Sequence, residues 1–367
     1  MTGVKQERLL VLDVFRGMTI FLMIVVNTQG SGAVPYAQLM HADWNGCTLT
    51  DLVFPSFLFA VGNAMVFALA PKAGRTRGDL VFKILKRSLL IFGIGYLLTW
   101  YPFIYTAWGE TRILAVLQRI ALAYGFAAFA ILYFSDRVLV LLGVLLLLGY
   151  WGLLYCGGDQ GAPYSLLGNA VRKLDLRILG ERHMYREKGV VFDPEGILST
   201  LPSIVNVLAG YLAGKWILLK GRSLGTVTGL LLAGVVLTGA GLLWSGWFPL
   251  NKKLWTSSYV CLTTGLDLLF LGLLFYLIEL RSWRAGTYFF SVFGRNPLLI
   301  YIFSTLIGVL LIWKVSKDQV FIDWVNEVLF QRIAPGPAGC LLFSVGFTMV
   351  CWAVGWILDR KKIFIRL

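Results

Sequence analysis

The stretch HADWNGCTLTDLVFPSFLFAVG, residues 41–62, joins a short polar segment to a long apolar run. His41 is one of only two histidines in the chain, and Asp51 stands at the start of the apolar run. The apolar run continues to about residue 70, close to the roughly 20 residues that a helix needs to cross a bilayer. The stretch therefore predicts a transmembrane helix with a titratable pair at one end.

The composition extends this prediction to the whole chain. Hydrophobic residues make up 58% of it, charged residues only 14%, and the mean hydropathy is +0.75. Soluble domains are rarely so apolar. Apolar runs long enough to span a bilayer recur about ten times: 9–27, 52–70, 82–100, 114–134, 138–156, 196–219, 224–244, 255–279, 289–313 and 340–358. We expect one all-α domain over residues 1–367, a polytopic bundle of about ten transmembrane helices in a lipid bilayer.

The net charge of +14 reflects basic residues that gather at the ends of these runs. This distribution follows the positive-inside rule, places both termini in the cytoplasm, and argues against nucleic acid as a partner. The basic residues concerned are Lys5, Arg8, Lys72, Arg75, Arg77, Lys220, Arg222, Arg281, Arg284, Arg360, Lys361, Lys362 and Arg366. The first run keeps Asp13 and Arg16 and has no small-residue cleavage site, so it predicts a retained helix and not a signal peptide.

Two segments between the runs predict structure of their own. The stretch 157–195 is too long for a simple connection and predicts an external loop subdomain. Residues 318–334 predict an interfacial helix, because Phe321, Trp324 and Val328 share one face. The five cysteines are scattered without paired spacing, which favours packing roles over disulfides or a metal site.

Polar residues within or beside the runs form two layers under this topology. Ionisable groups in membrane spans are costly, so function is the first hypothesis for them. The outer layer includes Asn27, His41, Asp51, Arg119, Glu195, Trp255 and Ser257, and the inner layer includes Asp13, Arg16, Arg87, Arg295 and Asn296. Two polar layers at opposite faces of one bundle predict two ligand entrances.

Structural explanations compete with function for several of these residues. Asp13 and Arg16 are spaced for a mutually neutralising pair. Arg87 could extend to cytoplasmic headgroups, and Asp51 could cap its helix. Trp44 and Trp255 suit an aromatic belt.

His41 is harder to explain structurally, because Asn27 and Asp51 stand at the two helix ends that its loop connects. A neutral imidazole can act as a base or nucleophile near neutral pH when a carboxylate orients it. Asp51 could supply that carboxylate, and Asn27 could donate to a developing oxyanion.

A family resemblance runs through the chain in the same order. The segments RLLVLDVFRGMTIFLMIVVNTQG (8–30) and HADWNGCTLTDLVFPSFLFAVG (41–62) resemble the heparan-α-glucosaminide N-acetyltransferase family. So do RILAVLQRIALAY, FDPEGILSTLPSIVNVLAGYLAG, NKKLWTSSYV and FGRNPLLIY, which begin at residues 112, 192, 251 and 293. The lysosomal enzyme of this family has extra N-terminal sequence, so the resemblance implies a compact bacterial relative in the inner membrane.

The resemblance implies a transmembrane acetyl transfer from cytoplasmic acetyl-CoA to a glucosamine amine on the far, periplasmic side. His41 matches the family's active-site histidine, an acetyl carrier or general base, and Asn27 and Asp51 match residues that work beside it. It also implies a homodimer, and a thioester donor requires no metal. From sidedness we expect CoA phosphate contacts from Arg16, Arg87, Arg295 and Asn296. Acceptor contacts are expected from Trp44, Asn45, Arg119, Glu195, Trp255 and Ser257.

Two other functions stay open on the sequence. Ten spans with polar groups at both faces would suit an amino-sugar transporter related to N-acetylglucosamine carriers, although the dissimilar halves of the chain disfavour a carrier. O-acetylation of an envelope glycan would use the same His41 chemistry on a hydroxyl group. No matched residue specifies the acceptor sugar.

Overall fold

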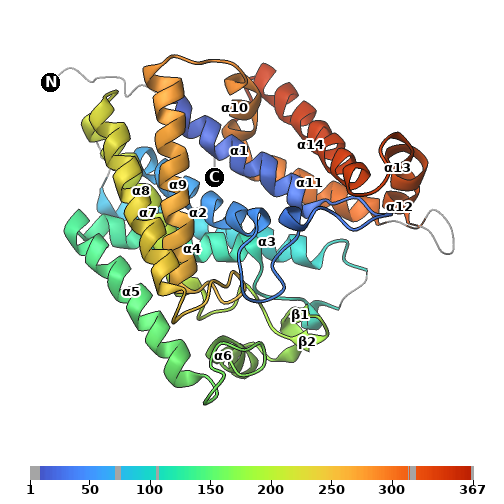
Figure 1. The fold of residues 1–367 in the computed structure, drawn as a ribbon, viewed down its shortest axis with the longest axis horizontal. Coiled ribbons are helices and arrows are strands. Elements are labelled where there is room, and N and C mark those ends of the chain that lie inside the picture. The colour runs from blue at the N-terminus through green and yellow to red at the C-terminus, as the bar shows by residue number, and fades with distance from the viewer. Residues whose placement is uncertain (1–8, 71–75, 105–106, 313, 315–319, 365–367) are drawn as a thin grey trace.

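The computed structural model describes residues 9–70, 76–104, 107–312, 314 and 320–364, and its fold is almost entirely helical (Figure 1). The helices are α1 Leu10–Asn27, α2 Leu49–Ala68, α3 Arg77–Trp100, α4 Val116–Tyr133, α5 Asp136–Gly157, α6 Ala170–Ile178, α7 Thr200–Lys220, α8 Leu224–Trp244, α9 Ser257–Phe275, α10 Thr287–Arg295, α11 Pro297–Leu311, α12 Phe321–Val325, α13 Gln331–Ile333 and α14 Pro337–Arg360. The described strands, β1 Arg186–Glu187 and β2 Val190–Val191, form one antiparallel hairpin.

Eight helices in the described part of the chain are long and apolar enough to cross a membrane, and nine if a bent pair counts as one span. This confirms the all-α membrane fold, but the expected number of about ten is not reached. The difference lies in α3, which is long yet carries Lys83, Lys86 and Arg87. The expected run 289–313 is the bent pair, in which α10 and α11 meet at 82°.

Helices of the bundle approach closely where glycine faces backbone. A Cβ atom at Gly62 of α2 would lie 2.0 Å from the carbonyl oxygen of Val207 on α7. A Cβ at Gly210 of α7 would lie equally close to the oxygen of Phe59 on α2. Each glycine therefore gives room to the partner's backbone, as in membrane helix pairs built on small residues. This contact brings the start of α7 beside the start of α2.

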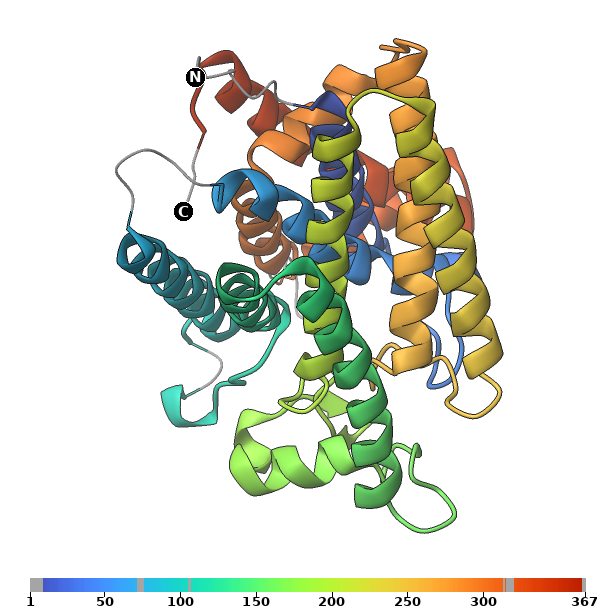
Figure 2. The same cartoon turned by 90° about the vertical axis from the view of Figure 1, so that its left-hand side faces the viewer.

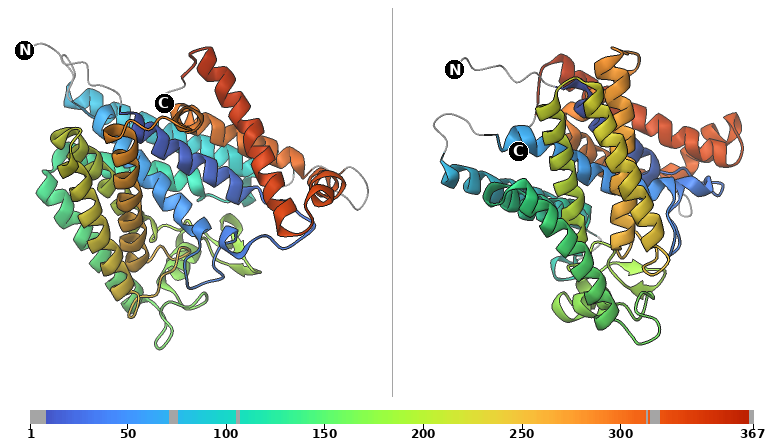
Figure 3. Two further views of the ribbon diagram at one scale, coloured as in Figure 1. Left: turned by 45° about the horizontal axis from the view of Figure 1, so that its top comes forward. Right: turned by 60° about the vertical axis from the view of Figure 1, so that its left-hand side comes forward.

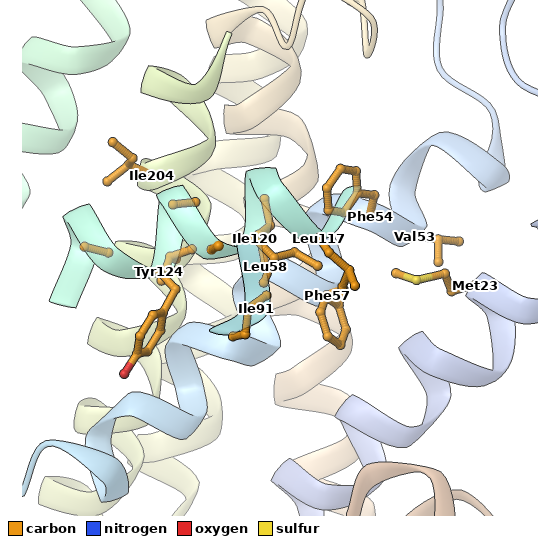
Figure 4. Packing of buried hydrophobic residues seen from close by; sticks show 14 of the residues in the cluster. Met23, Val53, Phe54, Phe57, Leu58, Ile91, Leu117, Ile120, Tyr124 and Ile204 are labelled. Atoms are coloured by element: carbon orange, nitrogen blue, oxygen red, sulfur yellow. The ribbon is translucent and has the colours of Figure 1, made fainter. Parts of the chain in front are cut away.

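The largest hydrophobic cluster lies where α1, α2, α4 and α7 meet, and it includes Phe54, Phe57, Leu117 and Tyr124 (Figure 4). By contrast, α5 and α8 expose many leucine and valine side chains, as expected of lipid-facing helices. The largest cluster thus lies among helices that also carry polar residues at their ends.

The segment 157–195, which the sequence predicts to be external, folds onto one end of the bundle and contains α6, β1 and β2 (Figure 2). The segment from α12 to α13 lies at the periphery, joined by a π-helical turn at Asn326–Phe330 (Figure 3). Its Phe321, Trp324 and Val328 side chains are exposed, which suits a helix lying at a membrane surface. Residues 318 and 319 of the expected interfacial helix lie outside the described residues.

Candidate active site

The residues at one end of the bundle surround a cavity of about 290 Å³. It lies where α1 ends, where α2 and α4 begin, and beside the loops that lead into α7 and α9. Its polar lining residues include Asn27, His41, Arg112, Glu195, Lys252 and Lys253. Three of the sequence-predicted site residues, Asn27, His41 and Glu195, are therefore brought together here from distant segments.

His41 and Asp51 form a directed pair at this cavity. The Nδ1 atom of His41 lies 2.7 Å from Oδ1 of Asp51, whose side chain is almost fully buried while that of His41 is 43% exposed. An ionised carboxylate only accepts, so Nδ1 carries the proton and Nε2 keeps its lone pair. A base or nucleophile is thus presented to the cavity, as in triads where a carboxylate fixes the histidine tautomer.

Asp51 is held in place by the start of α2. Its Oδ2 atom accepts hydrogen bonds from the backbone N–H of Thr48 at 3.0 Å and of Ala42 at 3.1 Å. Thr48 and Asp51 form the capping box of α2. The helix-capping role and the histidine-orienting role are therefore combined in one carboxylate, with one oxygen for each.

Lys252 is the closest cation to the imidazole. Its Nζ atom lies 3.0 Å from Nδ1 and 3.1 Å from Nε2 of His41, and 3.9 Å from Oδ1 of Asp51. Burial lowers the pKa of Lys252, and the carboxylates of Asp51 and Glu195 oppose this shift. Lys252 is thus the nearest amino group to the reactive nitrogen, and Asp51 and Glu195 are the groups that favour its charged form.

Arg112 supports the opposite wall of the cavity through two carboxylates. Its guanidinium donates to Asp193 at 2.9 and 2.6 Å and to Glu195 at 2.5 Å. Burial alone would raise the pKa of Glu195, but the charges of Arg112, Arg119 and Lys252 hold it below its ordinary value. Glu195 is therefore an ionised acceptor at the cavity wall.

The external hairpin closes over the same site. Lys188 pairs with Asp43 at 2.8 Å, and Lys253 donates to Glu187 at 2.8 Å and to the Asp43 carbonyl at 2.7 Å. The loop between α1 and α2 accordingly lies beside β1 and β2 (Figure 1). Tyr185, Glu187 and Pro194 of the external segment line the cavity.

A second cavity, of about 110 Å³, lies further along the same helices. Arg16 on α1 and Arg87 on α3 line it, together with Phe57 and Tyr124. Arg16 precedes Asn27 by eleven residues, or about 16 Å of helix. The layer of Phe54, Phe57 and Leu117 separates the two cavities, and these side chains pack in one cluster (Figure 4).

The two arginines of the inner cavity are held differently. Arg16 donates to the Gly294 carbonyl at 3.1 Å and lies 3.7 Å from Asp13, which is the internal pair anticipated from their spacing. The guanidinium of Arg87 lies over the Tyr124 ring at 4.7 Å, and its buried Nε has no hydrogen-bond partner within the described residues. Arg87 thus retains capacity to bind an anion.

Arg295 and Asn296 lie outside the lining of this cavity. Arg295 pairs with Asp359 of α14 at 2.6 Å, and Asn296 donates to the Ile363 carbonyl at 2.9 Å. They tie the bend between α10 and α11 to the end of α14. Their neighbours in sequence, Pro297 and Leu298, do line the cavity.

Five residues predicted to contact the acceptor also lie behind the outer cavity and not in its lining. Trp44 donates to the Tyr164 carbonyl at 2.8 Å, and Asn45 accepts from Asn251 at 3.2 Å. Trp255 is buried and donates to Asn206 at 3.0 Å, with Arg119 stacked on its ring at 4.9 Å. Ser257 donates to the Leu147 carbonyl at 2.7 Å. These groups support the walls of the site.

Sequence reasoning missed Arg112, Tyr185 and Lys252 as cavity residues. Lys252 and Arg112 stand within the family-like motifs NKKLWTSSYV and RILAVLQRIALAY, which also contain predicted site residues. Lys252 could have been singled out because it precedes a transmembrane helix at its expected outer end, where the positive-inside rule disfavours lysine. Tyr185 offers no comparable signal. Among the described residues, no group of three or more histidine, cysteine, aspartate or glutamate side chains is arranged to hold a metal ion.

Asp175 on α6 makes the stability of this end of the protein depend on pH. Burial raises its pKa to about 7, while the Ile197 N–H bond opposes the shift. The folded state keeps this proton up to about pH 7, whereas an unfolded chain loses it near pH 4. Protonated Asp175 contributes its full stabilisation of the folded state below about pH 4. Between about pH 4 and pH 7 this contribution to the free energy of unfolding falls by about 1.4 kcal/mol per pH unit, and above pH 7 it is lost.

Asp175→Asn should therefore flatten the pH dependence of stability, because the amide does not ionise. We expect the melting temperature of the variant in detergent to fall less between pH 5 and pH 8 than that of the wild type. Asp159→Asn is the matched control, since Asp159 is exposed and pairs with Lys173 on the same external segment. Parallel melting curves for wild type and Asp175→Asn across this range would contradict the assignment.

Comparison with known proteins agrees with this arrangement. The family model described as heparan-alpha-glucosaminide N-acetyltransferase, catalytic, matches residues 8–222. A human protein named heparan-alpha-glucosaminide N-acetyltransferase is 29% identical over 419 residues, covering 97% of this chain and 59% of the human protein. The mouse protein of the same name is 28% identical over 416 residues, covering 98% of this chain and 60% of the mouse protein.

The chain thus spans about three fifths of the length of these relatives. The matched region includes His41, Arg112 and Glu195 of the outer cavity, the Asp51 partner of His41, and both arginines of the inner cavity. Because the family model covers more than half of the sequence, the chain belongs to the heparan-alpha-glucosaminide N-acetyltransferase catalytic family.

Proposed function

We propose that this protein is a transmembrane acetyltransferase that moves acetyl from cytoplasmic acetyl-CoA to the amine of a terminal glucosamine or related amino sugar on the other side. The observation that carries the proposal is the His41–Asp51 pair in an outer cavity, aligned on α1, α2 and α4 with an inner cavity that holds Arg16 and Arg87. Family membership supports the acetyl chemistry. The same proposal places the chain in a bacterial inner membrane.

The donor would enter by the inner cavity. Arginine binds phosphate well because its planar guanidinium offers paired donors, and Arg87 has an unused buried donor there. The pantetheine arm is narrow and would pass between Phe57 and Leu117 once these side chains rotate. Its thioester would then reach the outer cavity beside Nε2 of His41.

The acceptor would enter by the outer cavity. Glu195 and Glu187 offer carboxylates to an ammonium or to sugar hydroxyls, and Tyr185 offers an aromatic face. His41 then takes a proton from the amine, or carries the acetyl group and passes it on. In either route the C–S bond of the thioester breaks, an amide C–N bond forms, and CoA leaves as the thiol.

A transporter of amino sugars is the second candidate, and one observation favours it. Helices α10 and α11 are broken by an 82° bend at Asn296, and broken helices are common in carriers. A carrier would move sugar without acetyl-CoA, whereas the transferase needs the thioester for every turnover.

Sealed proteoliposomes separate the two functions. Labelled acetyl-CoA is supplied outside and glucosamine is enclosed, and we expect labelled N-acetylglucosamine to accumulate inside. Glucosamine flux in the absence of acetyl-CoA, with no acetylated product in its presence, would replace the proposal by transport. A second set of vesicles with an enclosed hydroxyl-bearing glycan tests O-acetylation.

Arg87→Met tests the donor entrance. Loss of a charge-assisted phosphate contact is expected to weaken acetyl-CoA binding by about 10- to 100-fold, with little change in the acceptor KM. Binding is measured by titrating CoA into the purified protein. Lys220→Met serves as the control, because Lys220 ends α7 and stacks on Trp216 outside this cavity. Unchanged CoA affinity in Arg87→Met would place the phosphates elsewhere.

A further inference from the structure

Lys252 lies within hydrogen-bond distance of both imidazole nitrogens of His41. Its Nζ is nearly equidistant from Nδ1 and Nε2, at 3.0 and 3.1 Å. An in-plane position so close to both nitrogens would collide with the carbon between them, so Nζ lies over a face of the ring. Asp51 is the carboxylate partner of Nδ1 at 2.7 Å, and Lys252 is the partner described for Nε2.

The neighbours of Lys252 fix this position. Asp51 lies 3.9 Å from Nζ, and Glu195 and Lys252 line the same cavity. The lysine side chain is only 16% exposed. An ammonium so enclosed, with the Asp51 carboxylate nearby, is preorganised and has little rotamer freedom left to lose during a reaction.

The adjacent lysine is engaged differently. Lys253 donates to the Asp43 carbonyl and to Glu187, and so fastens the external hairpin to the bundle. No hydrogen bond between Lys253 and His41 is present among the described residues. The two consecutive lysines therefore point to separate partners, and only Lys252 reaches the imidazole.

We propose that Lys252 is a catalytic residue whose ammonium stabilises the oxyanion formed on the acetyl carbonyl at Nε2 of His41, an inference that rests on the proposed acetyltransferase function. When Nε2 attacks the thioester, a C–N bond forms and the carbonyl π electrons move to oxygen. The resulting tetrahedral carbon projects substituents on both sides of the ring plane. One of them, the oxyanion, can occupy the side on which Nζ lies.

Collapse of this intermediate restores the carbonyl and breaks the C–S bond, and the sulfur leaves as thiolate and takes up a proton. Attack of the sugar amine on the acetyl-imidazole forms a second oxyanion at the same carbon, beside the same ammonium. Collapse of this oxyanion breaks the bond between the acetyl carbon and Nε2 and leaves the amide. The proton that the amine loses balances the one that the thiolate takes up, and His41 is released unchanged. Lys252 gives up no atom in either step, which distinguishes it from the nucleophile.

Lys252→Met tests the proposal in the full-length purified protein. We expect kcat for amino-sugar acetylation to fall by about 10²- to 10³-fold, as for loss of one oxyanion donor, with CoA affinity within about twofold of the wild type. The kcat of Lys252→Arg should be at least about tenfold above that of Lys252→Met, because arginine restores the positive charge in a side chain of different shape. Lys173→Met, an exposed α6 lysine paired with Asp159, controls for loss of one positive charge.

A double variant separates catalysis from support of the fold. With His41→Ala already present, Lys252→Met should lower the residual rate by less than about threefold, because no acetyl group is attached to the ring. A wild-type-like kcat in Lys252→Met, or a loss confined to CoA affinity, overturns the proposal. Acetyl found on Lys252 by mass spectrometry during turnover also overturns it. Absence of product from the wild type removes the proposed function itself.

Discussion

His41→Ala is expected to lower acetyl transfer by at least about 10³-fold, because the substitution removes the only imidazole at the cavity and with it the base or acetyl carrier. The side chain is half-exposed and its loss leaves no core void, so the variant should fold and still bind CoA. The measurement is the rate of labelled N-acetylglucosamine formation from acetyl-CoA and glucosamine.

The chain offers a matched control in its other histidine. His183 sits on the external segment, its Nδ1 lies 2.8 Å from the Thr111 carbonyl, and it does not line the cavity. His183→Ala should keep activity within about twofold. Equal activity of wild type and His41→Ala would remove His41 from the chemistry.

The same proteins distinguish a covalent carrier from a general base. If His41 carries acetyl, label should remain on the wild-type protein after incubation with acetyl-CoA alone and be absent from His41→Ala. If it acts as a base, neither protein retains label, while the difference in turnover stays. Both outcomes keep His41 at the centre of the reaction.

Asp51→Asn is expected to have the second large effect, a loss on the order of 10³- to 10⁴-fold in kcat. The amide can donate its N–H to Nδ1 of His41, which moves the imidazole proton to Nε2 and removes the lone pair presented to the cavity. The change keeps the shape of the side chain, so the loss should appear in kcat more than in substrate affinity. Steady-state kinetics with both substrates measures it.

A second capping box separates this catalytic effect from helix stability. Thr76 and Asp79 cap α3 as Thr48 and Asp51 cap α2, with the Thr76 N–H 2.8 Å from Asp79. The described hydrogen bonds of the two histidines go to Asp51, Lys252 and Thr111. Asp79→Asn should cost a similar fraction of stability, about 1 kcal/mol, without the loss of turnover. If both asparagine variants lose activity equally, the cap and not the histidine explains the effect.

Much of the fold could be predicted from the sequence because bilayer solvation acts locally. Each apolar run must satisfy its backbone hydrogen bonds internally and therefore becomes a helix. The expected number of spans is not confirmed where charge and chain geometry compete with hydropathy: α3 carries four basic residues in its first half, and the run 289–313 bends at Asn296. Hydropathy averages over a window and is insensitive to a single hinge.

The site was only partly predictable, for a related reason. His41 and Asp51 are ten residues apart and belong to one loop and one cap, so their pairing is a local property that the sequence determined. Glu195 was chosen from its motif, but its partner Arg112 lies 83 residues away. Trp255 and Arg119 come from distant segments of the sequence, and the tertiary structure places them against each other behind the wall.

The sequence by itself determined the membrane helices, the family and the His41–Asp51 pair, because hydropathy, motif order and short-range hydrogen bonding need no knowledge of distant contacts. Only the tertiary structure decided which cations face the chemistry. Lys252 lies 211 residues from His41 and Arg87 stacks on Tyr124 of another helix, and the packing of α2, α4, α7 and α9 sets those positions. The sequence does not distinguish a lysine or arginine at the site from one elsewhere, because its role depends on the burial and the partners that helix packing provides.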